Sequence, residues 1–283
     1  MKSSERINQL LGDGIEETLD PELKRSFEFD DNEVPKEIMK PENVRLDKDH
    51  FRVSGDGVFY TIQGEGKTMG MPCVFLRLHV CNLRCVWCDA WYTWNPKTPE
   101  FWTEARQWTI DQTAENIRAS WGTLARIKKR LIVTGGEPLL QKDQIDSLMQ
   151  RLGADWILEI ETNGTIMPTE WQLANAQFNC SPKLRNSQNI DQVRRKKDVI
   201  QALVKVNTLF KFVVMHDSDL DEIEKEWVEE YGIPVDQVCL MPQGVTAEEV
   251  SINAQRVVEY AKVKGYRLLG RLQNEIWGAK RRV

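Results

Sequence analysis

The sequence lacks any apolar run that approaches the roughly 18 to 20 residues needed to span a bilayer. Residues 1–14 carry neither a basic flank nor an apolar stretch followed by a cleavage site. A hydrophobic content of 41% over 283 residues is nevertheless enough to bury the core of one large domain or two small ones. We therefore expect a soluble, folded chain that is not exported and does not bind a membrane.

Basic tracts are also absent, and the net charge of -5 comes from the N-terminal part of the chain. Residues 1–50 hold 8 Lys or Arg against 14 Asp or Glu, which leaves 30 against 29 in the rest of the chain. A neutral body gives no electrostatic reason to expect direct binding to nucleic acid, so a small-molecule substrate is favoured. Regular apolar patterns begin only after the acidic segment. We therefore predict an acidic N-terminal extension at 1–50 and one domain at 51–283.

Cysteine is too sparse for a secreted disulfide scaffold, because only six occur in the chain. Three of them, Cys81, Cys85 and Cys88, crowd into eight positions. Clustered thiols in a reducing cytosol more often hold metal, so a cytoplasmic protein with a metal site is expected. The other three are expected to pack as small buried side chains. They are Cys73, Cys180 and Cys239.

Short apolar runs rich in β-branched residues predict seven strands. They lie at 74–80, 131–134, 156–160, 178–180, 209–215, 237–240 and 266–269. Apolar residues at three- and four-residue steps predict helices between most of them, over 114–127, 145–152, 220–231 and 250–261. A capping box of Thr109 and Gln112 is predicted to begin the first helix and a basic turn at 128–130 to end it. Gly153, Gly232 and Gly265 are predicted to end the others. This alternation predicts a parallel sheet with crossover helices, whose ligand lies at the carboxyl ends of the strands.

The run Cys81-Asn-Leu-Arg-Cys85-Val-Trp-Cys88 follows the first predicted strand. Three thiolates on a short loop can hold three corners of an iron–sulfur cluster and leave one iron open. Zinc completed by His79 or Asp89 is an alternative, although a structural zinc site usually has two separated pairs of ligands. A second motif, Thr134-Gly135-Gly136-Glu137-Pro138, ends the next strand. Its glycines allow close backbone approach and its carboxylate suits an ammonium group.

The two motifs together resemble the radical S-adenosylmethionine (SAM) superfamily, which implies an α/β fold with a modified, incomplete TIM-like (β/α) barrel. The resemblance implies that the open iron of a [4Fe–4S] cluster binds the amino and carboxylate groups of SAM. No catalytic side chain is assigned beyond the cluster and its cofactor. The residues implied to contact SAM are Trp87, Cys88, Asp89, Gly135, Gly136, Glu137, Asn163, Ser181, Pro182, Lys183, Met241, Pro242, Gln243 and Gly244.

Further segments resemble one branch of that superfamily, the 7-carboxy-7-deazaguanine synthases. They lie at 61–66, 75–78, 87–89, 92–94, 161–165, 181–183 and 277–283, so the likeness covers 52–283. It implies ring contraction of 6-carboxy-5,6,7,8-tetrahydropterin to 7-carboxy-7-deazaguanine with loss of ammonia, for 7-deazapurine products of the queuosine type. Arg77 offers a fork of donors for the substrate carboxylate, and Gln63 and Glu65 could pair with the polar edge of the pterin. The substrate contacts implied are Ile62, Gln63, Gly64, Glu65, Arg77, Thr134 and Val283.

The resemblance also implies a homodimer, a reducing electron donor such as flavodoxin or ferredoxin, and bound Mg²⁺. The chain departs from the family pattern at Ala90, where a hydroxyl associated with Mg²⁺ is usual. Because a methyl group cannot bind a hard cation, the ion would use the substrate carboxylate, water and Asp89, shift to Thr93, or be lost. Val80 stands in place of a usual glycine and Gln273 in place of a usual histidine.

Three other interpretations stay open on the sequence. An activating enzyme would abstract hydrogen from a glycine of a partner protein, although such an enzyme does not need the Gln-Gly-Glu-Gly segment at 63–66. A zinc-bound interaction module would use the acidic arm to recruit another protein. A degenerate family member, suggested by Ala90 and Gln273, would bind a cluster without synthase activity.

Overall fold

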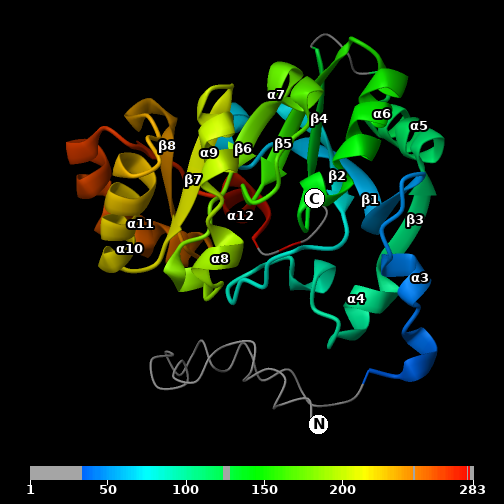
Figure 1. Ribbon diagram of the computed structural model, residues 1–283, viewed down its shortest axis with the longest axis horizontal. Helices are drawn as coiled ribbons and strands as arrows, with labels where there is room; N and C mark the ends of the chain where they lie inside the picture. Colours follow the sequence, from blue (N-terminus) through cyan, green and yellow to red (C-terminus); the bar gives the residue numbers. More distant parts are fainter. Residues whose placement is uncertain (1–33, 124–127, 245, 279, 281–283) are drawn as a thin grey trace.

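The computed structural model describes residues 34–123, 128–244, 246–278 and 280. Within them, nine strands form one open sheet in the order β3-β1-β2-β4-β5-β6-β7-β8-β9 (Figure 1). β1 is antiparallel to both β2 and β3, whereas each neighbouring pair from β2 to β9 is parallel. The strands are β1 His50–Ile62, β2 Pro72–Leu78, β3 Ala105–Thr109, β4 Lys129–Gly135, β5 Trp156–Thr162, β6 Gln177–Cys180, β7 Thr208–Val214, β8 Val238–Pro242 and β9 Arg267–Leu268.

Helices follow most of the parallel strands, and none in the described ranges is long and apolar enough to cross a membrane. They are α3 Pro41–Val44, α4 Pro99–Thr103, α5 Ile110–Trp121, α6 Lys142–Leu152, α7 Glu170–Asn175, α8 Asp191–Arg194, α9 Lys197–Val204, α10 Asp217–Glu222, α11 Ala247–Lys264 and α12 Leu272–Trp277. α10 continues into a π-helical segment, η6 Ile223–Glu229, and η2 Gly66–Thr68 is a short 3₁₀ turn.

The seven predicted strands are confirmed as β2 and β4 to β9. The capping box of Thr109 and Gln112 is present, but the prediction for the end of that helix is wrong. α5 ends at Trp121 because Gly122 turns the backbone to a φ of 64°, a conformation that favours glycine. Of the residues expected to continue it, 124–127 lie outside the described residues, and the basic pair at 129–130 belongs to β4.

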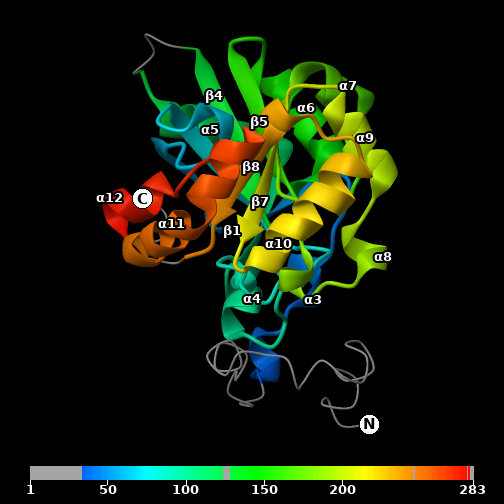
Figure 2. The same cartoon turned by 90° about the vertical axis from the view of Figure 1, so that its left-hand side faces the viewer.

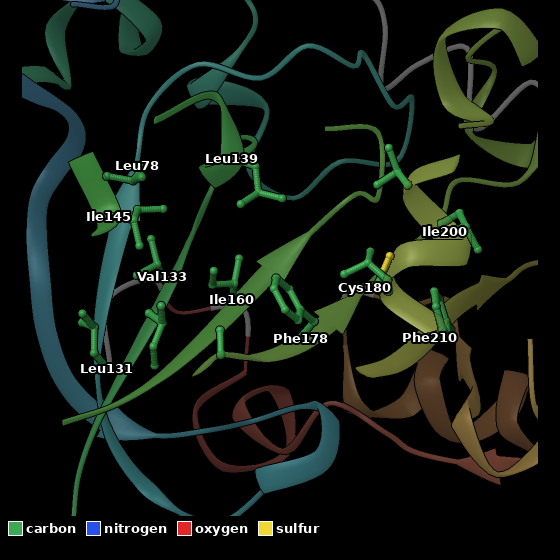
Figure 3. Close-up of a cluster of buried hydrophobic side chains, with 14 of the residues drawn as sticks. Leu78, Leu131, Val133, Leu139, Ile145, Ile160, Phe178, Cys180, Ile200 and Phe210 are labelled. Carbon is green, nitrogen blue, oxygen red and sulfur yellow. The ribbon is translucent and has the colours of Figure 1, made fainter. Parts of the chain in front are cut away.

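Alternation along the strands gives the sheet two different faces. The outer face is apolar and packs against α5, α6, α9, α10 and α11 (Figure 2). Leu131 and Val133 of β4, Ile160 of β5 and Phe178 of β6 contribute to this core (Figure 3). The predicted burial of Cys73, Cys180 and Cys239 is confirmed.

The intervening residues of these strands face the opposite side, where polar residues lie between two small apolar groups, one at Cys73, Phe75 and Ile132 and one at Leu209, Cys239 and Met241. The polar residues of this face include Arg77, Arg130, Thr134, Glu159, Glu161, Asn179 and Lys211. α12 and the residue before it lie over this inner face, where the backbone N–H of Leu272 donates to the carbonyl of Gly64 at 3.0 Å. The polar inner face and the loops at the carboxyl ends of the strands therefore adjoin each other.

Candidate active site

The cysteine loop, residues 79–90, follows β2. Cys85 is buried, Cys81 and Cys88 are half-buried, and none of the three is in a disulfide. Asn189 Nδ2 lies 3.3 Å from Cys85 Sγ, and a backbone N–H of the loop itself lies 3.4 Å from Cys81 Sγ. Burial raises the pKa of all three thiols, to about 12 for Cys88. N–H donors of this kind stabilise thiolates bound to iron, so the donor set fits a three-cysteine iron–sulfur cluster.

The Gly-Gly-Glu segment after β4 lies directly against the start of the cysteine loop. Gly136 N donates to the carbonyl of Leu78 at 3.1 Å, and Glu137 N donates to that of Val80 at 3.0 Å. A Cβ on Gly135 or Gly136 would come within 2.0 Å of these two carbonyl oxygens. Only glycine permits this approach, so the motif is required by packing before any ligand is considered.

Glu137 is fully buried, and both of its carboxylate oxygens accept hydrogen bonds. Oε1 accepts from Leu139 N at 3.0 Å and from Thr162 Oγ1 at 2.8 Å, and Oε2 accepts from Asn163 N at 2.7 Å. Burial raises the pKa of Glu137, although these donors act against the rise. The carboxylate therefore joins the loop after β4 to the loop after β5.

Two more predicted SAM segments meet the cysteine loop. Asn163 Nδ2 donates to Asn82 Oδ1 at 2.9 Å. Lys183 Nζ lies 2.9 Å from Ser181 Oγ and 5.2 Å from the centroid of the Trp87 ring, a cation–π contact. Pro182, which lies between Ser181 and Lys183 in sequence, is buried. The structure thus gathers the predicted residues from the ends of β2, β4, β5 and β6 around the three thiols.

The fourth predicted segment, 241–244, follows β8. Met241 and Pro242 are buried, and Gln243 N donates to the carbonyl of Val214 at 2.9 Å. The segment is joined to the cysteine loop by Arg271, which donates to the carbonyl of Gly244 at 3.3 Å and forms an ion pair with Asp89.

Glu65, predicted to contact substrate, lies in a cluster of charges on the inner face. Its Oε2 is 3.0 Å from Lys211 Nζ, and its Oε1 is 3.0 Å from Arg271 Nε and 2.8 Å from Gln273 Nε2. Burial acts to raise the pKa of Glu65, but the two cations hold it well below its usual range. Burial would lower the pKa of Lys211, yet the charges of Glu65 and Glu161 hold it above its usual range. Glu65 and Lys211 are therefore both charged at neutral pH.

Gln63 joins this cluster to the centre of the sheet. Its Nε2 lies 3.0 Å from Glu159 Oε1 and 3.2 Å from Glu161 Oε1, and its Oε1 accepts from Glu65 N at 3.2 Å. Thr134 Oγ1 donates to Glu161 Oε2 at 2.6 Å. A continuous set of donors and acceptors thus runs across β4, β5 and β7.

Arg77 lies beside Thr134 in the register of β2 and β4 and is half-buried, with its guanidinium 5.9 Å from the centroid of the Phe59 ring. Burial acts to raise the pKa of Asp89, but Arg271 and, to a smaller extent, Arg77 hold it below its usual range. Ile62 ends β1 directly before the buried Gln63. The predicted contact at Val283 lies outside the described residues.

Sequence reasoning missed several polar residues of the inner face. They are Arg130, Glu159, Asn179, Lys211 and Arg271, and Glu161 was noted without a role. Glu159 and Lys211 each interrupt a largely apolar strand. Because buried charged residues are rare unless they are paired, a charge at such a position indicates a partner or a function. Arg271 follows a two-residue strand in an irregular segment, where no local pattern indicates a role.

Comparison with known proteins agrees with the site described above. The Radical SAM superfamily profile matches residues 76–176, from β2 through the cysteine loop to the end of α7. The 7-carboxy-7-deazaguanine synthase of Pyrobaculum aerophilum is 33% identical over 226 residues, covering 79% of this chain and 94% of that protein. The chain belongs to the 7-carboxy-7-deazaguanine synthase family.

Other members of this synthase family agree with the assignment. The synthase of Halobacterium salinarum is 33% identical over 244 residues, covering 78% of this chain and 88% of that protein. The crystal structure of QueE from Escherichia coli has the same fold, with a TM-score of 0.58 and 22% identity over 79% of this chain and 94% of that one. As a radical SAM enzyme, this synthase family member uses a [4Fe–4S] cluster, SAM and a reductant.

Proposed function

We propose that this protein is a lyase that converts 6-carboxy-5,6,7,8-tetrahydropterin to 7-carboxy-7-deazaguanine with loss of ammonia. The observation that supports this most is the continuity of the cysteine loop with the polar inner face. Asp89 follows the last cysteine and is joined through Arg271 to Glu65. A substrate bound on the inner face would therefore lie beside the cofactor.

The cofactors are assigned to the loops at the carboxyl ends of the strands. Cys81, Cys85 and Cys88 would hold the [4Fe–4S] cluster, and the segments after β4, β5, β6 and β8 would hold SAM. When bound, the cluster and SAM would supply the radical chemistry that removes hydrogen from the substrate. Glu137 holds two of these loops together, and its full burial keeps water from the junction between them.

The pterin is assigned to the inner face because the polar groups there match it. Its ring edge carries both donors and acceptors, as do Gln63, Glu161 and Thr134. Its carboxylate needs a cation, and Arg77 offers a planar fork that can bind it with two hydrogen bonds. Glu65, Ile62, Gly64 and Val283 complete the proposed substrate contacts.

Magnesium, the remaining cofactor implied by the resemblance, does not fit these residues. Asp89 already pairs with Arg271, and Ala90 offers only a buried methyl group. Thr93 is fully buried, and its hydroxyl donates to the Ala90 carbonyl at 2.7 Å. No step of the proposed reaction therefore uses Mg²⁺.

The direct test is anaerobic reconstitution, reduction and incubation with SAM and 6-carboxytetrahydropterin. We expect about four iron and four sulfide per chain, and both 5′-deoxyadenosine and 7-carboxy-7-deazaguanine by mass spectrometry. Cys85→Ala should lose the brown cluster, whereas Cys73→Ala, a buried thiol outside the loop, should keep it. Formation of 5′-deoxyadenosine alone would refute the substrate assignment and leave the radical SAM assignment standing.

The same experiment separates the alternatives. Product formation without a protein partner would count against an activating enzyme, and the visible absorption of a cluster would count against zinc.

Four further proposals rest on the resemblance or on composition: a homodimer, flavodoxin or ferredoxin as electron donor, a cytoplasmic location, and residues 1–50 as an acidic extension to the domain at 51–283. Of the extension, α3 contacts β3, and Asp47 pairs with Arg52 at 2.6 Å.

A further inference from the structure

Arg271 bridges the two halves of the site with all three nitrogens of its guanidinium. Nε lies 3.0 Å from Glu65 Oε1, Nη2 forms an ion pair with Asp89 Oδ2, and Nη1 lies 3.3 Å from the carbonyl of Gly244. The side chain is 22% exposed, so it is largely enclosed by its partners. Among the ion pairs of the described residues, Arg271 is the only cation that pairs with both Glu65 and Asp89.

The two carboxylates need a positive charge between them. Like charges repel, and Arg271 lies between the two carboxylates as a cation paired with both. A divalent cation could supply the positive charge, but it would be repelled by a guanidinium already paired with Asp89. A hard cation also needs oxygen ligands, and Ala90 and Thr93 supply no free hydroxyl. Arg271 and a magnesium ion therefore compete for one place.

We propose that Arg271 takes the place of the divalent cation in this enzyme, so that turnover does not depend on Mg²⁺. This inference rests on the proposed function and adds Arg271 to Arg77 as a second positive charge that positions the substrate carboxylate. Lys211, 3.0 Å from the other oxygen of Glu65, adds a further positive charge. Two neighbouring side chains thus provide the charge that one divalent ion would bring.

The hydrogen-bond count supports a direct role toward an anion. A guanidinium has five N–H donors, and the three partners above take one each. Two N–H groups, on Nη1 and Nη2, then remain for a substrate carboxylate among the contacts of the described residues. Because the guanidinium is fixed at three points, these donors are oriented before the substrate binds.

The test uses full-length, reconstituted protein in metal-free buffer, with Mn²⁺ as a paramagnetic probe. We expect wild-type turnover to change by less than about twofold on addition of Mg²⁺, and EPR to show no stoichiometric Mn²⁺ site with SAM and pterin present. The double variant Ala90→Thr, Arg271→Gln restores the hydroxyl and removes the competing charge. It should bind about one Mn²⁺ per chain and gain turnover by about tenfold or more on addition of Mg²⁺.

Single variants and a control show whether the charge of Arg271 is the cause of these effects. Arg271→Gln should raise the KM for the pterin more than it lowers kcat, and Arg271→Lys should restore part of that loss without creating a Mn²⁺ site. Arg256→Gln removes an exposed arginine that pairs with Asp217 at 3.2 Å and should change neither measurement.

A stoichiometric Mn²⁺ site in the wild type, or a stimulation by Mg²⁺ of about tenfold or more, would overturn the inference. If the wild type formed no product under any condition, the proposed function would fail. Mn²⁺ binding would still decide between an arginine and a metal ion at Asp89, because it needs no turnover.

Discussion

The side chain of Gln273 lies against Gly64, so closely that a Cβ on Gly64 would come within 1.8 Å of Gln273 Oε1. The backbone of Gly64 is not in the left-handed region, so the space, not the conformation, requires glycine here. The same contact brings Gln273 Nε2 to 2.8 Å from Glu65 Oε1, and Leu272 N to 3.0 Å from the Gly64 carbonyl. The absence of a side chain at Gly64 therefore lets α12 pack closely on the polar inner face.

Gly64→Ala should displace Gln273 and remove its hydrogen bond to a carboxylate. Such a bond contributes about 1.5 to 3 kcal/mol, so kcat/KM for the pterin should fall by about tenfold or more. Steady-state kinetics would measure this. Gly270→Ala is the matched control, because the added Cβ would meet the flexible end of Glu275 at 3.1 Å and Val250 Cγ1 at 3.8 Å, an ordinary contact distance. Equal kinetics for the two variants would show that Gln273 does not act on substrate binding.

Val80→Gly should stabilise the protein. Val80 has a φ of 77°, in the left-handed region that β-branched residues rarely adopt. Relief of about 1 to 2 kcal/mol of strain is partly offset by the greater freedom of glycine in the unfolded chain, about 0.4 to 1 kcal/mol. The free energy of unfolding should therefore rise by up to about 1.6 kcal/mol, measured by urea denaturation of the cluster-free protein. A lower midpoint would mean that packing of the isopropyl group outweighs the strain.

Local patterns predicted the parallel part of the fold well. Seven strands, the capping box at Thr109 and the glycine ends at Gly153 and Gly265 depend on residues close together in sequence. The Gly-Gly-Glu turn and the cysteine loop also follow strands directly, so their meeting at one edge of the sheet was predictable from topology.

The antiparallel part was not predictable in the same way. β1 shifts register between Val53 and Val58, where two glycines with positive φ interrupt the alternation that would indicate a strand. β3 pairs only with β1 and is largely exposed, so it lacks an apolar signal. Arg271 is brought to Glu65 by the path of the chain over the inner face, 206 residues away in sequence.

Lys211→Met should destabilise the fold. The lysine side chain is only 5% exposed, and its removal leaves Glu65 with less positive charge. Breaking one side of a buried pair costs about 3 to 5 kcal/mol. Adding Glu65→Gln to this variant should recover part of the loss, because the carboxylate that has lost one of its two cations is then gone. Lys262→Met, which breaks an exposed pair with Glu259, should change the free energy of unfolding by less than about 1 kcal/mol.

Stability should also fall in acid because of Glu65. Its pKa in the folded protein lies below the ordinary 4.5, so ionised Glu65 contributes stability above that pH. The contribution is lost as the pH falls from 4.5 toward the lowered folded pKa. Urea midpoints measured over this acid range should decline less steeply for Glu65→Gln than for the wild type. Parallel declines would place the acid sensitivity in other carboxylates.

Asn189→Ala should make the cluster harder to reduce. Asn189 Nδ2 lies 3.3 Å from Cys85 Sγ, and the Arg84 backbone N–H fixes the amide by donating to its oxygen at 2.9 Å. Reduction adds negative charge that an N–H donor to sulfur stabilises, so losing the donor should shift the midpoint potential to a more negative value. A redox titration followed by EPR would measure the shift, with Asn175→Ala, whose amide donates to the Trp171 carbonyl, as control. An unchanged potential would mean that the 3.3 Å contact is lost when the cluster is bound, and that the cysteine loop rearranges around the iron.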